Sequence, residues 1–211
     1  SYISEDKEGN ILFSMDEGVF SYSYVTDQLS VEYSLPDEMI KNGDFVRAHS
    51  LSQNILFIGT TVGLYAVVKG QKTPLLINHL HSVEQTIDNM NVKVLYADDQ
   101  DTLWVGTVEG LFSLSLSQAK AFVLGTHPAP EAKLRIENRN IWKLGGFNGD
   151  AFYAATDKGV FNYQTKSDQL QHIFLPTDSR DYISSDVLND LIIDSNNNIW
   201  LGSAADGAMY W

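Results

Sequence analysis

The chain has 211 residues, no cysteine, and 27 acidic against 14 basic residues, which gives a formal net charge of -13. The absence of cysteine excludes disulfides, thiolate catalysis and thiolate zinc sites. The negative charge argues against binding to nucleic acid or to an anionic membrane, because both would repel the chain. No apolar run approaches the roughly 20 residues that a membrane span needs, and the first residues do not have the pattern of a signal peptide.

One pattern recurs five times in chain order: an apolar strand, a small residue, a turn that ends in glycine, and a second apolar strand. The copies are NILFSMDEGVFSY (10–22), ILFIGTTVGLYAV (55–67), TLWVGTVEGLFSL (102–114), AFYAATDKGVFNY (151–163) and NIWLGSAADGAMYW (198–211). Their turn glycines are Gly18, Gly63, Gly110, Gly159 and Gly207, which lie 45 to 49 residues apart. So steady a period predicts an array of equivalent units.

Further strands are expected on both sides of each copy. The upstream segments are FVRAHS (45–50), VLYADD (94–99), IWKLGG (141–146) and LNDLIIDS (188–195). The downstream segments are LSVEYSL (29–35), TPLLI (73–77), KAFVLG (120–125) and LQHIFL (170–175). Each unit of about 47 residues is therefore predicted to hold four short strands. The best helical candidate is SVEQTIDNM (82–90), a single turn or short helix between units.

The residue types that recur at equivalent positions of the copies can be explained physically. The small-residue position holds Ser14, Gly59, Gly106, Ala155 and Gly202, so a neighbouring backbone or a large side chain is expected to pack closely there. A hydroxyl follows in four copies, at Thr60, Thr107, Thr156 and Ser203. The turn glycine is expected to have a positive φ, which glycine adopts at little cost.

Four strands in each repeat of 40 to 50 residues are typical of a β-propeller blade. Leucine-rich and ankyrin solenoids have shorter periods, and tandem immunoglobulin-like domains would need a period near 100 residues. We therefore predict an all-β protein, a β-propeller of about five four-stranded blade repeats that occupies residues 1–211 as a single region. The last unit lacks its final strand, which favours a fragment of a longer chain over the alternative of a small five-bladed ring.

The segments DDQDTLWVGTVEGLF (98–112) and DSNNNIWLGSAADGAMYW (194–211) resemble the two-component regulator propeller repeat most closely. The copies at 10–22 and 151–163 are degenerate, and the last copy has one extra residue between Gly202 and Gly207. The resemblance implies the extracytoplasmic sensor region of a bacterial membrane receptor, in the periplasm. It also implies a larger propeller of about seven blades, of which these five repeats would be a fragment of a longer receptor. It also implies downstream segments that this chain does not contain: a transmembrane helix and a histidine kinase, hybrid kinase or diguanylate cyclase module.

Several motifs that suggest chemistry have simpler readings. DSNNN (194–198) opens like a calcium loop, but Ile199 and Ala205 stand where glycine and glutamate would be needed, so an Asp/Asn turn is predicted. The HLH segment with His79 and His81 has no third zinc ligand. Ser117 and Lys120 form Ser-x-x-Lys in an expected strand-to-strand loop rather than on a helix. We predict no catalytic residue, no metal site and no cofactor.

Two residues are candidates for ligand binding. Trp142 breaks the repeat pattern in the predicted innermost strand of the fourth unit, where it could stack on a sugar ring. Tyr182 ends the polar loop DSRDY (178–182) in a long connection between units. GGFNG (145–149) is predicted to be a hairpin whose turn is Asn148–Gly149. Trp104 and Trp200, at equivalent repeat positions, are predicted to pack in the core.

Three function classes remain, in decreasing order of preference. The first is a non-catalytic module that senses a small molecule or a glycan for a membrane receptor. The second is a propeller hydrolase or lyase acting on a glycan, and the third is a structural interaction scaffold. An open sheet edge at 205–211 further predicts self-association, with a homodimer as the expected form. The chain would meet a membrane only through the absent downstream segments.

Overall fold

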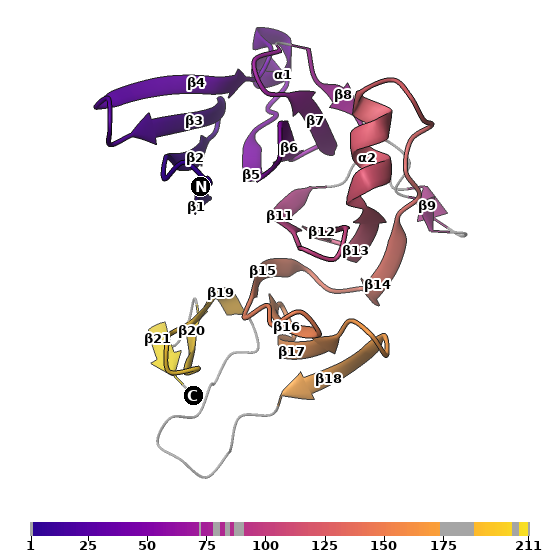
Figure 1. The fold of residues 1–211 in the computed structure, drawn as a ribbon. Coiled ribbons are helices and arrows are strands. Elements are labelled where there is room, and N and C mark those ends of the chain that lie inside the picture. The colour runs from indigo at the N-terminus through magenta and orange to yellow at the C-terminus, as the bar shows by residue number, and fades with distance from the viewer. Residues whose placement is uncertain are drawn as a thin grey trace. The chain divides into compact units, whose positions relative to one another are not determined.

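The computed structural model describes residues 2–71, 73–77, 81–82, 85–86, 91–173, 188–203 and 207–210, with the backbone alone at 81–82 and 85–86. Five antiparallel sheets of three or four described strands follow one another along the chain, and a two-stranded sheet lies between the second and the third in sequence (Figure 1). The chain divides into two compact units. One is formed by Ser1–Val105 with Phe112–Lys133, and the other by Gly106–Leu111 with Leu134–Trp211. The prediction of an all-β protein built from propeller blades is confirmed.

Strands follow each other in sequence order within every blade. Sheet 1 contains β1 (Ile3–Glu5), β2 (Ile11–Met15), β3 (Gly18–Ser23) and β4 (Gln28–Ser34). Sheet 2 contains β5 (Val46–Ser52), β6 (Ile55–Thr60), β7 (Leu64–Val68) and β8 (Leu75–Leu76). Sheet 3 contains β11 (Val92–Ala97), β12 (Thr102–Thr107), β13 (Gly110–Ser115) and β14 (Lys133–Glu137). Sheet 4 contains β15 (Ile141–Gly145), β16 (Ala151–Thr156), β17 (Gly159–Gln164) and β18 (Gln169–Ile173). Sheet 5 has three described strands, β19 (Leu188–Ile193), β20 (Ile199–Ser203) and β21 (Gly207–Tyr210).

Two predictions about secondary structure are wrong. The segment 120–125, expected to be a strand, lies in and just after the helix α2 (Leu116–Val123), and the fourth strand of its blade is β14. The hydroxyl of Ser115 caps this helix by accepting a hydrogen bond from the Gln118 N–H. The described part of 82–90, expected to be helical, instead belongs to the paired strands β9 (His81–Ser82) and β10 (Gln85–Thr86). A five-residue helix, α1 (Asp37–Lys41), was not predicted.

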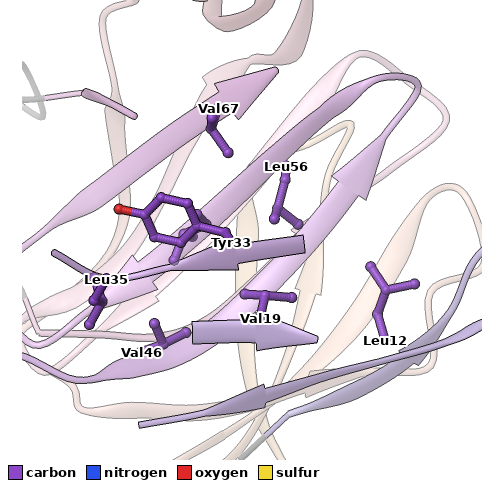
Figure 2. Close-up of a cluster of buried hydrophobic side chains, with 8 residues drawn as sticks. Leu12, Val19, Tyr33, Leu35, Val46, Leu56 and Val67 are labelled. Carbon is purple, nitrogen blue, oxygen red and sulfur yellow. The ribbon is translucent and has the colours of Figure 1, made fainter. Parts of the chain in front are cut away.

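The cores lie between neighbouring sheets. In the first unit, Leu12, Val19 and Tyr33 of sheet 1 pack against sheet 2, as Figure 2 shows. The sheet 2 side chains in this cluster are Val46, Leu56, Ile58 and Val67. In the second unit, Ala155 and Val160 of sheet 4 pack against four residues of sheet 5, namely Leu188, Leu191, Ile199 and Leu201. Because alternate strand residues face opposite sides, each blade can bury apolar side chains against two neighbours.

Close packing at the small-residue position is confirmed. A Cβ atom added to Gly59 would lie 2.5 Å from Cγ1 of Val92, which is on the inner strand of the next sheet. The turn glycine, by contrast, is required for different reasons in different blades. Gly159 has a φ of +95°, as predicted. Gly110 does not have a positive φ, and an added Cβ would instead lie 2.2 Å from the carbonyl oxygen of Ile136 on β14.

The repeated threonine closes the turn in each of three blades. The Thr107 hydroxyl donates to the carbonyl oxygen of Gly110 at 2.9 Å and accepts from the N–H groups of Glu109 and Gly110, at 3.1 and 3.0 Å. Thr60 and Thr156 donate in the same way to Gly63 and Gly159. All three threonines are fully buried. The hydroxyl therefore accepts from N–H groups that the tight turn would otherwise leave unpaired.

The carboxylate of an aspartate holds together the hairpin between the first two strands of a blade by hydrogen bonds, an arrangement that we call a staple. Asp98 accepts from the N–H groups of Gln100 and Thr102, at 2.9 and 2.8 Å, with one oxygen. Its other oxygen accepts from the indole N–H of Trp104 at 2.8 Å. This arrangement is a turn in which both carboxylate oxygens are occupied, as predicted for this segment.

Asp194 repeats this arrangement in sheet 5. It accepts from the N–H groups of Asn196 and Asn198, both at 2.9 Å, and from the indole N–H of Trp200 at 3.0 Å. The predicted turn is confirmed here as well. The two tryptophans are equivalent in hydrogen bonding but not in burial: Trp104 is 3% exposed and Trp200 is 44% exposed, so the prediction of core packing is wrong for Trp200.

Because of the Asp194 staple, the free energy of unfolding depends on pH. Hydrogen bonds from Trp200 and then Asn198 lower the pKa of Asp194 to about 2, from an ordinary value of 3.8. A carboxyl group with a depressed pKa stabilises the fold above its unfolded-state pKa, and this contribution is lost as the pH falls from about 4 to 2. We expect Asp194→Asn to reduce the loss of stability over that range. Urea unfolding followed by circular dichroism at pH 4 and pH 2 measures it.

Asp16→Asn is the matched control, since the exposed Asp16 carboxylate makes no hydrogen bond among the described residues. An equal effect of the two substitutions on the acid dependence would contradict this role of the Asp194 staple.

Candidate functional site

A cavity of about 280 Å³ lies where the innermost strands of sheets 1, 2 and 3 end. These strands are β1, β5 and β11, and all the lining residues belong to the first compact unit. The lining residues are Tyr2, Ser4, Glu5, Asp6, Lys7, Glu8, Leu12, His49, Ser50, Leu51, Gln53, Leu95, Tyr96 and Ala97. The volume suits a compact metabolite, because pockets for drug-sized ligands begin at about 300 Å³.

The three strands reach the cavity because each ends in a hairpin on the same edge. Asp6 staples the first hairpin by accepting from the N–H groups of Glu8 and Asn10, at 3.0 and 2.8 Å. Gln53 begins the second hairpin turn with a φ of +54°. Asp98 staples the third hairpin. The stapled turns therefore position the cavity rim, which carries Glu5, Glu8 and Lys7.

A buried histidine forms the floor. His49 on β5 is 0% exposed, and its two ring nitrogens each meet a serine of sheet 1. Nδ1 lies 2.6 Å from the Ser14 Oγ, and Nε2 lies 2.8 Å from the Ser4 Oγ. The ring of Tyr2 packs edge-on against the imidazole at 5.2 Å. Burial lowers the pKa of His49 to about 4, so the imidazole is neutral at pH 7.

Two phenols complete the wall. Burial raises the pKa of Tyr2, and the neighbouring Tyr96 raises it further. Burial also raises the pKa of Tyr96, with additional contributions from the negative charges of Asp98 and Asp99. Both hydroxyl groups therefore keep their protons at neutral pH. The wall and floor are uncharged and combine these polar groups with the apolar side chains of Leu12, Leu51 and Leu95. Three carboxylates and one ammonium group lie at the rim.

This arrangement suits binding better than nucleophilic catalysis. A serine within hydrogen-bond distance of a histidine nitrogen is one requirement of a serine hydrolase. The second nitrogen of such a histidine faces a carboxylate that stabilises the imidazolium form. Here that nitrogen faces the Ser14 hydroxyl, which has no negative charge. Among the described residues no group of three His, Cys, Asp or Glu side chains could hold a metal ion.

A second hollow, of about 610 Å³, lies on sheet 4 in the other compact unit. Its lining residues include Tyr153, Asn162, Gln164 and Gln171. The amide of Gln164 donates to the side-chain oxygen of Asn162 at 2.5 Å, so these polar groups partly satisfy each other.

Of the two ligand-binding candidates predicted from sequence, Trp142 does not line this cavity. Trp142 is half-buried on β15 in the second unit. Tyr182 lies outside the described residues, as do His79 and the side chain of His81. The turn at Asn148–Gly149 is confirmed, since the Asn148 side-chain oxygen accepts from the Ala151 N–H at 2.9 Å and Gly149 has a φ of +85°.

The predicted setting of the Ser-x-x-Lys motif is wrong, because Ser117 and Lys120 lie on the helix α2. The Ser117 hydroxyl donates to the Asp101 carboxylate at 2.7 Å, and the Ser117 N–H donates to the other oxygen at 2.8 Å. Asp101 also accepts from the hydroxyl of Ser115, the residue that caps the helix. These contacts hold the first turn of the helix against the β11–β12 hairpin, which is a structural role.

Sequence reasoning missed Ser4, Ser14 and His49. Ser14 was identified only as a small residue of the repeat, and His49 only as part of an inner strand. The signal available in the sequence is a histidine in a strand whose preceding residues alternate between apolar and polar. Its partners are 35 and 45 residues away in the sequence, so no local motif could connect the three.

Comparisons with known proteins agree with the repeat and the fold. The family model for the two component regulator propeller matches residues 86–109, which confirms the resemblance found in the sequence. No curated protein matches the chain. No helix among the described residues is both long enough and apolar enough to cross a membrane.

Three solved structures illustrate the similarity. The extracellular domain of the putative one component system BT4673 from B. thetaiotaomicron is 20% identical with a TM-score of 0.72 over 99% of this chain. That of the putative hybrid two component system BT3049 from the same organism is 16% identical with a TM-score of 0.70 over 99% of the chain. PorZ of Porphyromonas gingivalis, a surface component of its type-IX secretion system, is 14% identical with a TM-score of 0.70 over 100% of the chain. This chain spans 27%, 26% and 31% of their lengths, and at these identities the likeness is one of fold.

Proposed function

We propose that this chain, which carries a two-component regulator propeller repeat, is the ligand-binding sensor region of a bacterial membrane-bound receptor and lies in the periplasm. The observation that carries the proposal is the cavity between β1, β5 and β11, whose floor and walls are uncharged and mix polar with apolar side chains. Two structures of similar fold are extracellular domains of putative signalling systems, which supports the location and the role. The expected ligand is a small molecule or a small glycan unit.

The chain's part in signalling is to favour one conformation over another. The cavity lies between the inner strands of three blades, so a bound molecule would contact all three at once. A ligand shifts a conformational equilibrium by as much as its affinity for the two states differs. Binding that draws the three strands together would therefore favour the arrangement of blades in which they lie closest. The histidine kinase or diguanylate cyclase that would respond belongs to a longer polypeptide.

A thermal-shift screen tests the proposal, since a molecule that binds only the folded state raises the melting temperature. The compounds are neutral mono- and disaccharides, amino acids and short polyols. We expect at least one to stabilise the chain, and Ala97→Trp, which fills the cavity, to abolish the shift. Gln171→Ala in the hollow on sheet 4 is the matched control and should keep it. No stabilisation by any compound, or a shift that Ala97→Trp leaves intact, would refute the site.

The alternative of a hydrolase is favoured only by the Ser4–His49 contact. We propose that the cavity binds without catalysing a reaction, because the Nδ1 of His49 faces the Ser14 hydroxyl where a hydrolase has a carboxylate. Hydrolysis of p-nitrophenyl acetate or p-nitrophenyl glycosides separates the two functions. Turnover that is lost in Ser4→Ala would support the hydrolase instead.

Self-association is a further part of the proposal, and it is supported by a sheet face rather than by the predicted edge at 205–211. On one face of sheet 1, Ile3, Phe13, Phe20 and Val31 lie in a row across the four strands. Ile3 is 70% exposed and Val31 is 62% exposed. Phe13 occupies the repeat position of Ile58, which is fully buried against sheet 1. The exposed row is thus the face by which a blade of this repeat normally contacts its neighbour, and we propose that a second copy covers it.

The expected result is a concentration-dependent dimer that Val31→Lys converts to a monomer, because burying an unpaired ammonium group is costly. Light scattering coupled to gel filtration measures the mass. Val25→Lys is the control, since Val25 is 91% exposed in the β3–β4 turn and off this face. A monomer at high concentration, or an equal effect of both substitutions, would contradict the interface.

A further inference from the structure

The position of one proton can be deduced from the hydrogen bonds beneath the cavity. Ser14 on β2 is 1% exposed, and the only hydrogen-bond partner of its hydroxyl among the described residues is Nδ1 of His49, at 2.6 Å. A buried hydroxyl that donates to nothing is strongly disfavoured. The Ser14 hydroxyl therefore donates to Nδ1, and that nitrogen carries no proton.

The proton of the neutral imidazole is then on the other nitrogen. A neutral histidine has one N–H donor and one acceptor nitrogen. With Nδ1 as the acceptor, Nε2–H donates to the Ser4 Oγ at 2.8 Å. Ser4 accepts this bond, so its own proton is left for a different partner. Because Ser4 is half-buried and lines the cavity, that partner is whatever occupies the cavity.

We propose that the Ser14–His49–Ser4 chain fixes His49 as the Nε2–H tautomer and turns the Ser4 hydroxyl into a hydrogen-bond donor to the bound molecule. The ligand places an uncharged acceptor oxygen against Ser4, such as a carbonyl, ether or hydroxyl oxygen. A carboxylate is disfavoured, because the rim carries Glu5, Asp6 and Glu8 against the single positive charge of Lys7. Only the ligand class rests on the proposed function, since the tautomer is a property of the free protein.

Nitrogen-15 NMR of the free chain tests the tautomer directly. The two ring nitrogens of a neutral histidine have well-separated chemical shifts that show which one is protonated. Loss of one signal set in His49→Gln assigns His49 among the five histidines of the chain. We expect the Nε2–H form, unchanged between pH 5 and pH 8. The Nδ1–H form, or a protonated ring in that range, would overturn the relay whether or not any ligand binds.

A pair of serine variants shows whether Ser14 sets the tautomer. Ser14→Ala removes the donor to Nδ1, and we expect the Nδ1–H form to become populated. Ser50→Ala is the matched control, because Ser50 also lines the cavity but makes no hydrogen bond to His49. An unchanged tautomer in Ser14→Ala would overturn the relay.

Two probes of similar size test the ligand class. N-methylpyrrolidone only accepts hydrogen bonds, and pyrrolidine hydrochloride supplies a cation that only donates them. We expect N-methylpyrrolidone to shift the His49 Nε2 signal in a saturable way and Ser4→Ala to weaken its binding at least fivefold, with no such shift from pyrrolidinium. An Nε2–H tautomer in a cavity that prefers pyrrolidinium would leave the relay standing and overturn the acceptor-bearing ligand.

Discussion

Gly110→Ala is expected to destabilise the chain by about 3 kcal/mol or more, because the new methyl group overpacks a fixed backbone contact. The added Cβ would lie 2.2 Å from the carbonyl oxygen of Ile136 and 3.3 Å from its carbonyl carbon. Backbone atoms cannot rotate away as a side chain can, so β13 and β14 would have to separate. Urea unfolding followed by circular dichroism measures the loss.

Gly43→Ala is the control for this substitution. Gly43 has a φ of +84° with nothing within 4 Å of an added Cβ, so it measures conformational strain alone. We expect a loss of only about 1 kcal/mol there. Equal losses at Gly43 and Gly110 would show that the β13–β14 contact does not explain the turn glycine.

Thr107→Val is expected to cost about 2 kcal/mol, because removing the hydroxyl leaves the buried N–H of Gly110 and the part-buried N–H of Glu109 without their partner. Valine has nearly the same shape as threonine, so the loss reports the hydrogen bonds rather than a cavity. Thr107→Ser keeps the hydroxyl and should lose less than half as much. The free energy of unfolding from urea titrations checks both.

Thr102→Val on the same strand is the matched control, since the Thr102 hydroxyl makes no hydrogen bond among the described residues. Its effect should remain within about 0.5 kcal/mol, as for most substitutions away from special features. Comparable losses for Thr102→Val and Thr107→Val would contradict the turn-closing role of the repeated hydroxyl.

The blades could be predicted because their signals are local and repeated. Strand alternation, the small residue and the turn glycine each recur at 45 to 49 residues, so errors in one copy are corrected by the others. The prediction of a strand at 120–125 is wrong because the apolar residues of this segment suit a strand or a helix equally well. What decides for a helix is the Ser115 cap together with the Asp101 contact to Ser117, a residue 16 positions further along the chain.

The candidate site could not be predicted because it depends on how two sheets face each other. Ser4, Ser14 and His49 meet only after sheet 1 packs against sheet 2 through the Leu12 and Val46 cluster. Taken alone in the sequence, each serine is indistinguishable from any other polar residue of a strand. The same limit applies to Trp200, whose repeat position predicted burial although its side chain is 44% exposed.

The central claim is that the inner strands of the first three blades form a ligand site. A crystal structure of the chain with the most stabilising compound from the thermal screen tests it most directly. We predict that the compound lies between Tyr2 and Tyr96, with an oxygen within hydrogen-bond distance of the Ser4 Oγ. A compound bound elsewhere on the chain, with this cavity free of it, would contradict the claim.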